Sequence, residues 1–349
     1  MRGEFDFINF VRRQTEKKQR PSGLAMGIGD DAAVVTARPG NTSVVTTDLL
    51  IEDIDFRRHW TPPRLLGHKA LAVSLSDIAA MGARPRWTLI SIGVPSSVWK
   101  TNFPQEFYRG FFALADQYDV ALIGGDISGT PDRIVVNSTV IGEMKQQRHV
   151  LRAGARSGDL IFVTGKLGGA SAGLRLLEAG GQAPDNHPSS RPSKRRGFNA
   201  RELVMLRQLS PTPRVGWGIR LGEQRLATAM IDISDGLSSD LTHLTQASEV
   251  GATIEVERIP VDPLVEQVGM KNHEALALAL HGGEDFELLF SVRPRNRARV
   301  PKEVDGVPAT LIGEITDEAG RLQLQEGGRT RVLKPQGFVH FAGRGPSQK

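Results

Sequence analysis

Cysteine is absent from all 349 residues of the sequence. This absence excludes disulfides, thiolate metal sites and cysteine nucleophiles, and it fits a reducing cytoplasm. The first twenty residues hold early acidic side chains and no long apolar core, so we expect no secretory signal peptide. No stretch approaches the roughly 18 apolar residues of a membrane span. We therefore expect a cytoplasmic protein with no membrane partner.

The composition otherwise resembles that of an ordinary globular protein, with 39% hydrophobic and 24% charged residues. The length suits two domains. The formal net charge is +5, and much of the excess lies in residues 191–201. Nucleic-acid binding is one interpretation of this basic segment. A flexible, solvated insertion around 181–198 is the favoured one, because Phe198 alone supplies an aromatic ring between the charges, so we expect no nucleic-acid partner.

Aspartates stand where apolar runs end. An unpaired buried carboxylate costs several kcal/mol, so burial normally requires a compensating cation. Most of these positions have no adjacent lysine or arginine, and a hard divalent ion with oxygen ligands is the economical substitute. The pattern therefore indicates Mg²⁺, and through it phosphate. The positions are Asp30, Asp31, Asp48, Asp77, Asp126, Asp232 and Asp235.

Strands alternate with helices along both halves of the chain, which favours an α/β or α+β fold. A helix is expected from Pro62–Pro63 to Gly82, with Asp77 continuing its apolar stripe. The polar segment 151–159 is the expected boundary between domains at 1–150 and 151–345. Other expected strands are 42–49, 87–94, 120–124, 134–142, 159–165, 228–233, 252–257, 285–293 and 307–314. Other expected helices are 4–19, 103–118, 167–180, 199–209, 236–249, 273–281 and one after Pro213.

Several motifs allow two interpretations each. Thr46 and Thr47 precede Asp48, and this triplet is either a set of magnesium ligands or a turn. Ser234 lies between Asp232 and Asp235 at a strand–helix junction, where a helix N-terminus attracts phosphate and aspartates can hold its metal. An N-cap by Ser234 or Asp235 is the alternative.

Two glycine-rich segments do not complete familiar nucleotide motifs. Residues 27–31 place two aspartates where a dinucleotide fingerprint needs a glycine and a free helix N-terminus. Lys166 is followed by Leu167 rather than serine or threonine, so residues 163–169 are not a Walker loop. Glu284 follows two glycines, and it either recognises an amine-bearing substrate or shapes a turn.

Together these segments resemble the thiamine-monophosphate kinase family from about residue 4 to 341. The blocks that carry the resemblance include KALAVSLSDIAAMGA (69–83) and IDISDGLSSDL (231–241), in this order. The resemblance implies a two-domain fold like that of aminoimidazole ribonucleotide synthetase. Its N-terminal mixed sheet with helices pairs into a dimeric barrel, and its C-terminal domain is α/β.

The resemblance also implies residue roles. Magnesium ligands would be Asp31, Thr46, Thr47, Asp48, Asp77, Asp126, Asp232 and Asp235. ATP contacts would be Tyr108, Gly125, Asp126, Arg152 and Ser234. Substrate contacts would be Asp55, Glu284 and Phe338. Asp55 stands where the family commonly has a histidine, and Phe338 is assigned to a column that Pro335 also matches.

The implied reaction is transfer of a phosphoryl group from ATP to thiamine monophosphate, in a homodimer that binds several Mg²⁺ ions. The acceptor is a phosphate monoester whose second pKa is near ~6, so it is already ionised and needs no general base. Direct in-line transfer is therefore expected. A ligase similar to aminoimidazole ribonucleotide synthetase and a non-catalytic nucleotide-binding dimer are the alternatives.

Overall fold

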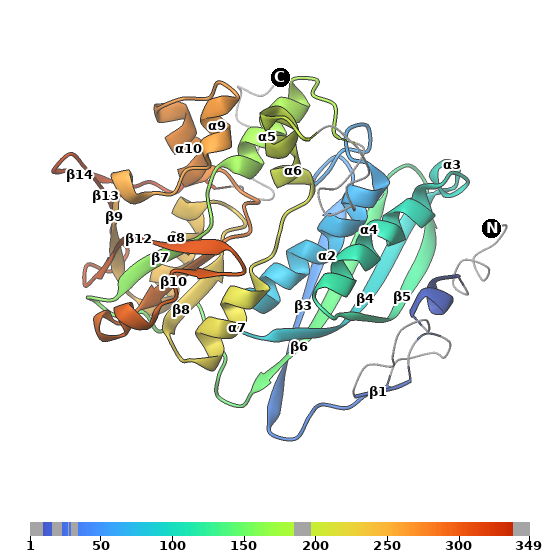
Figure 1. The fold of residues 1–349 in the computed structure, drawn as a ribbon, viewed down its shortest axis with the longest axis horizontal. Coiled ribbons are helices and arrows are strands. Elements are labelled where there is room, and N and C mark those ends of the chain that lie inside the picture. The colour runs from blue at the N-terminus through green and yellow to red at the C-terminus, as the bar shows by residue number, and fades with distance from the viewer. Residues whose placement is uncertain (1–9, 16–22, 27, 29–33, 185–196, 338–349) are drawn as a thin grey trace.

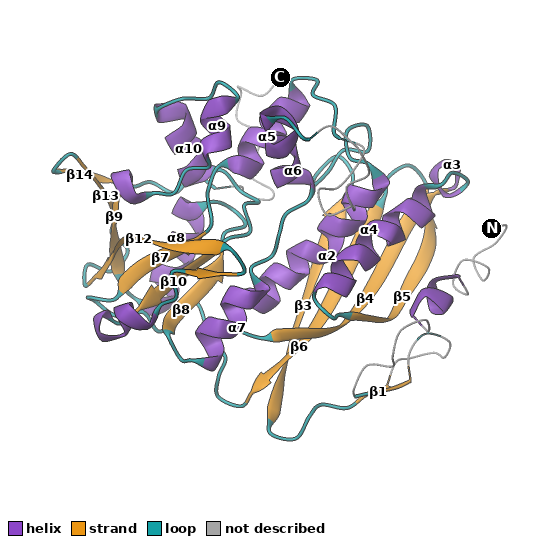
Figure 2. Cartoon of the chain, viewed as in Figure 1, coloured by secondary structure: helices purple, strands orange, loops and turns teal. Residues whose placement is uncertain are grey.

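The computed structural model describes residues 10–15, 23–26, 28, 34–184 and 197–337. Two sheets lie side by side, and helices cover them (Figures 1 and 2). Residues 10–15 are helical, and a short antiparallel pair, β1 (Leu24–Met26) and β2 (Val34–Val35), precedes the first sheet. The expected mixed α/β architecture is confirmed.

The N-terminal sheet has four strands in the order β3-β6-β4-β5. Only β4 and β5 are parallel, and the other two pairings are antiparallel. Helices α2 and α4 run next to each other along this sheet (Figure 2). The elements are β3 (Asn41–Ile51), α2 (Pro63–Ala80), β4 (Arg84–Pro95), α3 (Ser96–Trp99), α4 (Phe103–Gln117), β5 (Ala121–Thr130) and β6 (Val135–Lys145).

Helix α2 is buried along most of its length. It begins with Pro63 in the first turn, where proline is pre-organised for a helix, and Gly82 follows its end in a left-handed conformation (φ 74°). Fifteen of its residues are buried, on every side of the helix. A helix that is apolar all round belongs inside a protein. Contacts with the sheet, with α4 and with α7 supply that interior.

Two glycines set how closely α2 and α4 approach. A Cβ atom at Gly67 would lie 1.9 Å from the Phe107 carbonyl oxygen, and one at Gly110 would lie 1.8 Å from the Arg64 carbonyl oxygen. No side chain fits at either position. The two backbones are therefore in direct contact at these points.

The C-terminal sheet has eight strands along the path β14-β13-β9-β12-β7-β10-β8, with β11 paired to β12. Its pairings are antiparallel except that between β13 and β9. The strands are β7 (Leu160–Thr164), β8 (Ala227–Asp232), β9 (Gly251–Glu255), β10 (Leu288–Val292), β11 (Glu303–Val304), β12 (Val307–Thr316), β13 (Leu322–Glu326) and β14 (Arg329–Val332).

The helices of this half include two short 3₁₀ turns. They are α5 (Gly169–Glu178), α6 (Ala200–Leu209), α7 (Val215–Glu223), α8 (Leu237–Ser248), η1 (Val256–Arg258), α9 (Pro263–Gln267), α10 (His273–His281) and η2 (Pro294–Arg299). Helix α6 begins with a capping box between Asn199 and Glu202.

One hydrophobic core crosses the two halves. Leu71 and Phe107 from the N-terminal half belong to the same buried group as Trp217 and Phe290. Residues 151–159 form no helix or strand. The division at 150/151 stays a prediction, and the shared core means that the halves do not fold as separate interiors.

Two kinds of detail differ from the sequence expectations. Strand β5 does not end at residue 124 but continues through Gly124, Gly125 and Asp126 to Thr130. The elements that were not expected, because they are short or polar, are β1, β2, α3, η1, α9, η2, β11, β13 and β14. Of the expected insertion at 181–198, residues 185–196 lie outside the described part of the chain. Among the described residues, no helix is long and apolar enough to cross a bilayer.

Candidate active site

The middle of α2 brings three carboxylates together from different elements. Asp48 comes from β3, Asp77 from α2 itself, and Asp232 from the end of β8. A hydroxyl group holds one oxygen of each. Ser74 Oγ donates to Asp48 Oδ2 over 2.6 Å, and Ser76 Oγ donates to Asp232 Oδ2 over 2.7 Å. Thr46 Oγ1 donates to Asp77 Oδ2.

Burial governs the protonation of these groups. It raises the pKa of Asp48 to about 6, with the charge of Asp77 adding to the shift. It raises the pKa of Asp232 to about 7, again with Asp77 adding. The pKa of Asp77 is raised by its own burial, while Thr46 and the charge of Arg152 act in the opposite direction. The hydroxyl partners are neutral, and among the described residues no lysine or arginine forms a salt bridge with these carboxylates, so their charges repel one another.

The donor chemistry of this site fits a hard divalent cation. All the side-chain donors are carboxylate or hydroxyl oxygens, which are the ligands that Mg²⁺ prefers. Within the described ranges, however, no three acidic or histidine side chains are close enough to coordinate one ion together. Asp30 and Asp31 lie outside the described residues. The described carboxylates therefore influence one another's charge, but they do not by themselves form a complete set of ligands for one ion.

After the loop that follows β8, the first turn of α8 adds a fourth acid that the sequence analysis missed. Asp240 Oδ2 accepts from the backbone N–H groups of Asp235 and Gly236, both over 3.0 Å. Burial and the charges of Asp232 and Asp235 raise the pKa of Asp240 to about 8. Gly236 is the N-cap of α8 and no side chain caps it, so the N-cap alternative for Ser234 or Asp235 is wrong. The second aspartate in DGLSSD was the available signal.

Glu284 lies beside this loop. Its backbone N–H donates to the Ser234 carbonyl oxygen over 2.8 Å, and its φ of 67° is left-handed. Its carboxylate contacts Lys69 and Gln208. Asp285, the next residue, instead caps α5 by accepting from Gly168 N at 2.6 Å and Ala170 N at 3.0 Å.

Other expected site residues have different surroundings. Thr47 follows Thr46 on β3, so its side chain points to the opposite, exposed face, where it contacts Thr139 over 3.1 Å. Asp126 is exposed and accepts from the N–H of Ile127 over 2.9 Å. Asp55 Oδ2 accepts from Ile51 N over 2.8 Å, which closes a turn. Tyr108 is buried among Phe107, Phe111 and Phe112, and this burial raises its pKa.

The remaining expected contacts are less constrained. Gly125 lies inside β5 with φ 155°. A Cβ there would lie 2.0 Å from the Ile90 carbonyl oxygen, so only glycine fits. Arg152 is exposed, and its charge reaches both Asp77 and Asp232. Phe338 lies outside the described residues.

Comparison with known proteins places this arrangement in a family. Residues 29–144 match the family model described as AIR synthase related protein, N-terminal domain, and residues 156–325 match that of the corresponding C-terminal domain. A thiamine-monophosphate kinase from Bacillus subtilis (strain 168) is 35% identical over 341 residues, covering 97% of this chain and 99% of that protein. The chain belongs to the thiamine-monophosphate kinase family.

Solved structures of this kinase family have the same fold. The thiamine-monophosphate kinase from Stenotrophomonas maltophilia K279a matches with a TM-score of 0.79 at 35% identity, covering 94% of this chain and 97% of that one. AaThiL, solved in complex with AMPPCP and TMP, matches with a TM-score of 0.73 at 29% identity, covering 97% of both chains. The resemblance inferred from the sequence blocks is thereby confirmed.

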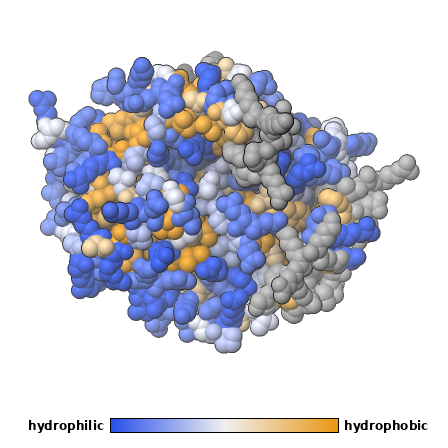
Figure 3. Space-filling view, viewed as in Figure 1, coloured by the Kyte–Doolittle hydropathy of each residue, from blue (hydrophilic) through white to orange (hydrophobic). Residues whose placement is uncertain are grey.

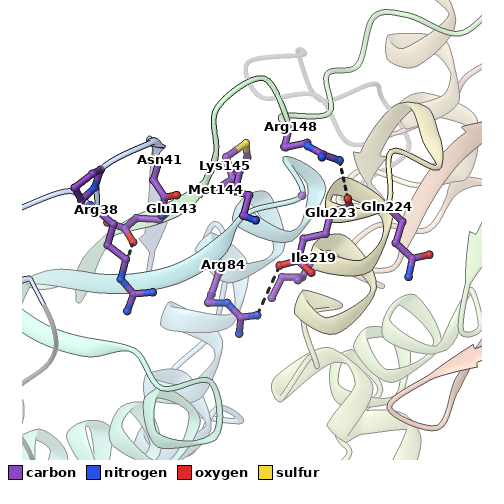
Figure 4. Close-up of a pocket in the computed structure, with 12 residues that line it drawn as sticks. Arg38, Asn41, Arg84, Glu143, Met144, Lys145, Arg148, Ile219, Glu223 and Gln224 are labelled. Carbon is purple, nitrogen blue, oxygen red and sulfur yellow. Dashed lines mark hydrogen bonds and ion pairs between the residues drawn. The ribbon is translucent and has the colours of Figure 1, made fainter.

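A separate cavity of about 600 Å³ lies at the C-terminal end of α2, beside Gly82 (Figure 4). None of the kinase-family site residues lines it. Its basic side chains have local partners: Arg148 donates to the Glu223 carbonyl oxygen over 2.8 Å, and Arg84 lies 4.0 Å from the Glu223 carboxylate. Cations at the C-terminal end of a helix are stabilising, so these contacts help to terminate α7. The cavity is not part of the candidate active site.

Proposed function

We propose that this chain catalyses the transfer of the γ-phosphoryl group of ATP to thiamine monophosphate, giving thiamine diphosphate and ADP. The observation that carries the proposal is the near full-length similarity to thiamine-monophosphate kinases, in a chain where serine hydroxyls of α2 hold Asp48 and Asp232 and no described lysine or arginine pairs with them. AaThiL binds both an ATP analogue and TMP. The ligase and the non-catalytic dimer are not favoured by these relatives.

Mg²⁺ is the proposed cofactor. Its ligands would be Asp31, Thr46, Thr47, Asp48, Asp77, Asp126, Asp232 and Asp235, and when bound it would neutralise the phosphate charges of both substrates. The hydroxyls of Thr46, Ser74 and Ser76 each occupy Oδ2 of their carboxylate. They would thereby orient Oδ1 toward an ion.

The substrate contacts are also proposals. Arg152 is suited to a triphosphate because its cationic side chain is exposed and lies near enough to Asp77 and Asp232 to interact with their charges. Tyr108, Gly125, Asp126 and Ser234 would complete the ATP site. Asp55, Glu284 and Phe338 would contact the thiamine moiety. No side chain is assigned as general base, because the attacking phosphate oxygen is already ionised near neutral pH.

A coupled ADP-release assay tests the proposal. Thiamine monophosphate, thiamine and a no-acceptor control are compared with and without Mg²⁺. We expect Mg²⁺-dependent ADP release with thiamine monophosphate alone, and no phosphoenzyme on rapid quench. Asp48→Ala and Asp126→Ala should each abolish turnover and leave thermal unfolding cooperative. Equal ADP release with all three acceptor conditions would contradict the kinase.

We also propose a homodimer and a cytoplasmic location. The exposed face of β3 supports the dimer, because Val45 and Leu49 are 63% and 53% exposed beside Thr47. Contiguous exposed apolar side chains on a strand commonly mark an interface. Sedimentation equilibrium should give twice the chain mass, and Val45→Glu combined with Leu49→Glu should give monomers. A monomer for the unaltered chain would refute the dimer.

A further inference from the structure

Lys69 is a buried cation that the proposed mechanism does not use. Its side chain, on α2, is 2% exposed. The ammonium group lies 2.8 Å from Oε1 and 2.9 Å from Oε2 of Glu284, so it contacts both carboxylate oxygens. Burying a lysine is costly unless it is paired, and Glu284 is the pairing group.

Side chains from two elements that are distant in sequence hold the Glu284 carboxylate in place. Lys69 comes from α2, Gln208 from α6, and Glu284 itself follows α10. Gln208 Nε2 donates to Glu284 Oε2. The left-handed backbone of Glu284 is tied to the Ser234 carbonyl oxygen. Both the backbone and the side chain are therefore fixed.

The hydrogen bonds leave one acceptor position open. A carboxylate oxygen accepts about two hydrogen bonds. Among the described residues, Oε2 of Glu284 has two donors, Lys69 and Gln208, whereas Oε1 has Lys69 alone. The Glu284 side chain is 29% exposed, so it is partly open to solvent and to a bound molecule. The ammonium cancels its charge, and what remains is a directional hydrogen-bond acceptor.

A purely structural ion pair in the same molecule looks different. Glu287 is 3% exposed, and donors reach both of its oxygens from Arg214, Thr164 and Lys166 N. No acceptor is left toward solvent there. The partly exposed side chain and the unfilled acceptor position distinguish Glu284 from a pair that only holds the fold together.

We propose that Lys69 is a positioning residue for substrate recognition. It fixes Glu284 as a charge-neutralised acceptor for one N–H group of the substrate, which thiamine offers as the exocyclic amine of its pyrimidine ring. Gln208 assists by occupying Oε2. This inference rests on the proposed function, in which Glu284 contacts the thiamine moiety. It assigns recognition to a directed hydrogen bond rather than to attraction between opposite charges.

Lys69→Met, in the full chain, tests the inference by separating KM from kcat. Without the ammonium, Glu284 loses its fixed orientation, so the KM for thiamine monophosphate should rise about tenfold or more. The KM for ATP and the kcat should each change less than about threefold, since neither depends on this contact. Lys100→Met is the matched control, because Lys100 is an exposed lysine that follows α3 and belongs to none of the proposed sites, so it should leave every constant unchanged.

A substrate analogue gives a readout that a merely structural role would not move. In this analogue a hydrogen atom replaces the exocyclic pyrimidine amine of thiamine monophosphate, so the N–H donor is missing. The unaltered enzyme should prefer the natural substrate by about a hundredfold in kcat/KM, and Lys69→Met should lose most of that preference. Equal losses of kcat/KM for both substrates, or an unchanged KM in a folded Lys69→Met protein, would overturn the inference.

Two further variants keep the outcomes distinct. Glu284→Gln should raise the KM for thiamine monophosphate. If that KM is unchanged, the substrate role of Glu284 in the proposed function fails as well. If Glu284→Gln raises the KM and Lys69→Met does not, only the role of Lys69 fails. Should Lys69→Met not fold, Gln208→Leu replaces it, with an expected rise of about threefold and an unchanged KM as the contrary result.

Discussion

Two groups of carboxylates in the interior of this protein differ in their partners. In the C-terminal half, Glu287 pairs with Arg214, and Asp262 pairs with Arg207 over 3.0 Å. Around α2, Asp48 and Asp232 have serine hydroxyls as partners instead. Asp232 is as buried as Glu287 and Asp262, whereas Asp48 is half-buried. The difference is a resident arginine, which the first group has and which the second lacks within the described part of the chain.

The presence or absence of a paired arginine distinguishes structural from functional carboxylates more clearly than their burial does. A buried carboxylate with its own arginine is complete when the chain folds. One with only a neutral hydroxyl must hold a proton or receive a cation from solution. The raised pKa values of Asp48 and Asp232 are the physical sign of that unmet requirement.

The largest effect is expected for Asp77→Asn, which alters the carboxylates around α2 that have no resident arginine. We expect turnover to fall by about a thousandfold or more, because the variant removes a proposed metal ligand. The free energy of unfolding should stay the same or rise, since like-charge repulsion with Asp48 and Asp232 disappears. Steady-state assays and urea unfolding measure the two effects. Asp132→Asn, at an exposed acid, is the control, and near-normal turnover of Asp77→Asn would count against the assignment.

The opposite variant is Arg214→Met in the group with resident cations. It leaves Glu287 buried without its partner, so the free energy of unfolding should fall by about 3–5 kcal/mol. Urea unfolding at pH 7 measures the loss. Replacing Glu287 by Met in the same protein should recover part of it, because the pair is then removed together. A loss below about 1 kcal/mol would show that the arginine is dispensable.

A pH series with and without Mg²⁺ tests the unmet charge requirement directly. Raised pKa values mean that the folded chain binds more protons than the unfolded chain, so stability falls as pH rises from about 4 to about 7. The shift of Asp48 from 3.8 to about 6 alone corresponds to roughly 3 kcal/mol. Chelator should preserve this fall, and Mg²⁺ should reduce it. Identical unfolding curves in EDTA and MgCl₂ at pH 8 would argue against a cation site.

The smallest effect is expected for an exposed pair. Arg175 Nη1 lies 2.7 Å from Glu274 Oε1, but about half of each side chain is exposed. Arg175→Ala should change the free energy of unfolding by less than about 1 kcal/mol, because solvent screens the pair. Urea unfolding beside Arg214→Met gives the ratio of the two effects. Equal losses would show that burial does not control the strength of these pairs.

The sequence predicted the helix of α2 and most strands because their apolar patterns are long and have clear ends. The positions of Asp48, Asp77 and Asp232 at the ends of apolar runs also marked them as candidate site residues. It could not predict which hydroxyls would hold them, since Ser76 and Asp232 are 156 residues apart. The strand through Asp126 was underestimated because Gly124 and Gly125 have low strand propensity.

Partners from distant elements were the least predictable part of the site. Lys69 and Glu284 are 215 residues apart, and Gln208 lies on a third element. No local spacing reports such a contact. The contacts of Asp240 are local, because its carboxylate accepts from the backbone N–H groups of Asp235 and Gly236, five and four residues earlier. Its role could therefore have been inferred from the sequence.

The close backbone contacts of α2 have a consequence for which molecules can react. Gly67 and Gly110 fix the helix against α4, and a Cβ at Gly218 of α7 would lie 2.1 Å from the Ala79 carbonyl oxygen, so α2 cannot slide along either neighbour. Lys69 and Ser76 are seven residues apart on nearly the same side, a span of about 11 Å along the axis. Under the proposed assignments, the spacing of Lys69 and Ser76 along α2 fixes the distance between the site for the acceptor's amine and the site for its phosphate. Phosphate esters much shorter or longer than this span should be turned away by size alone.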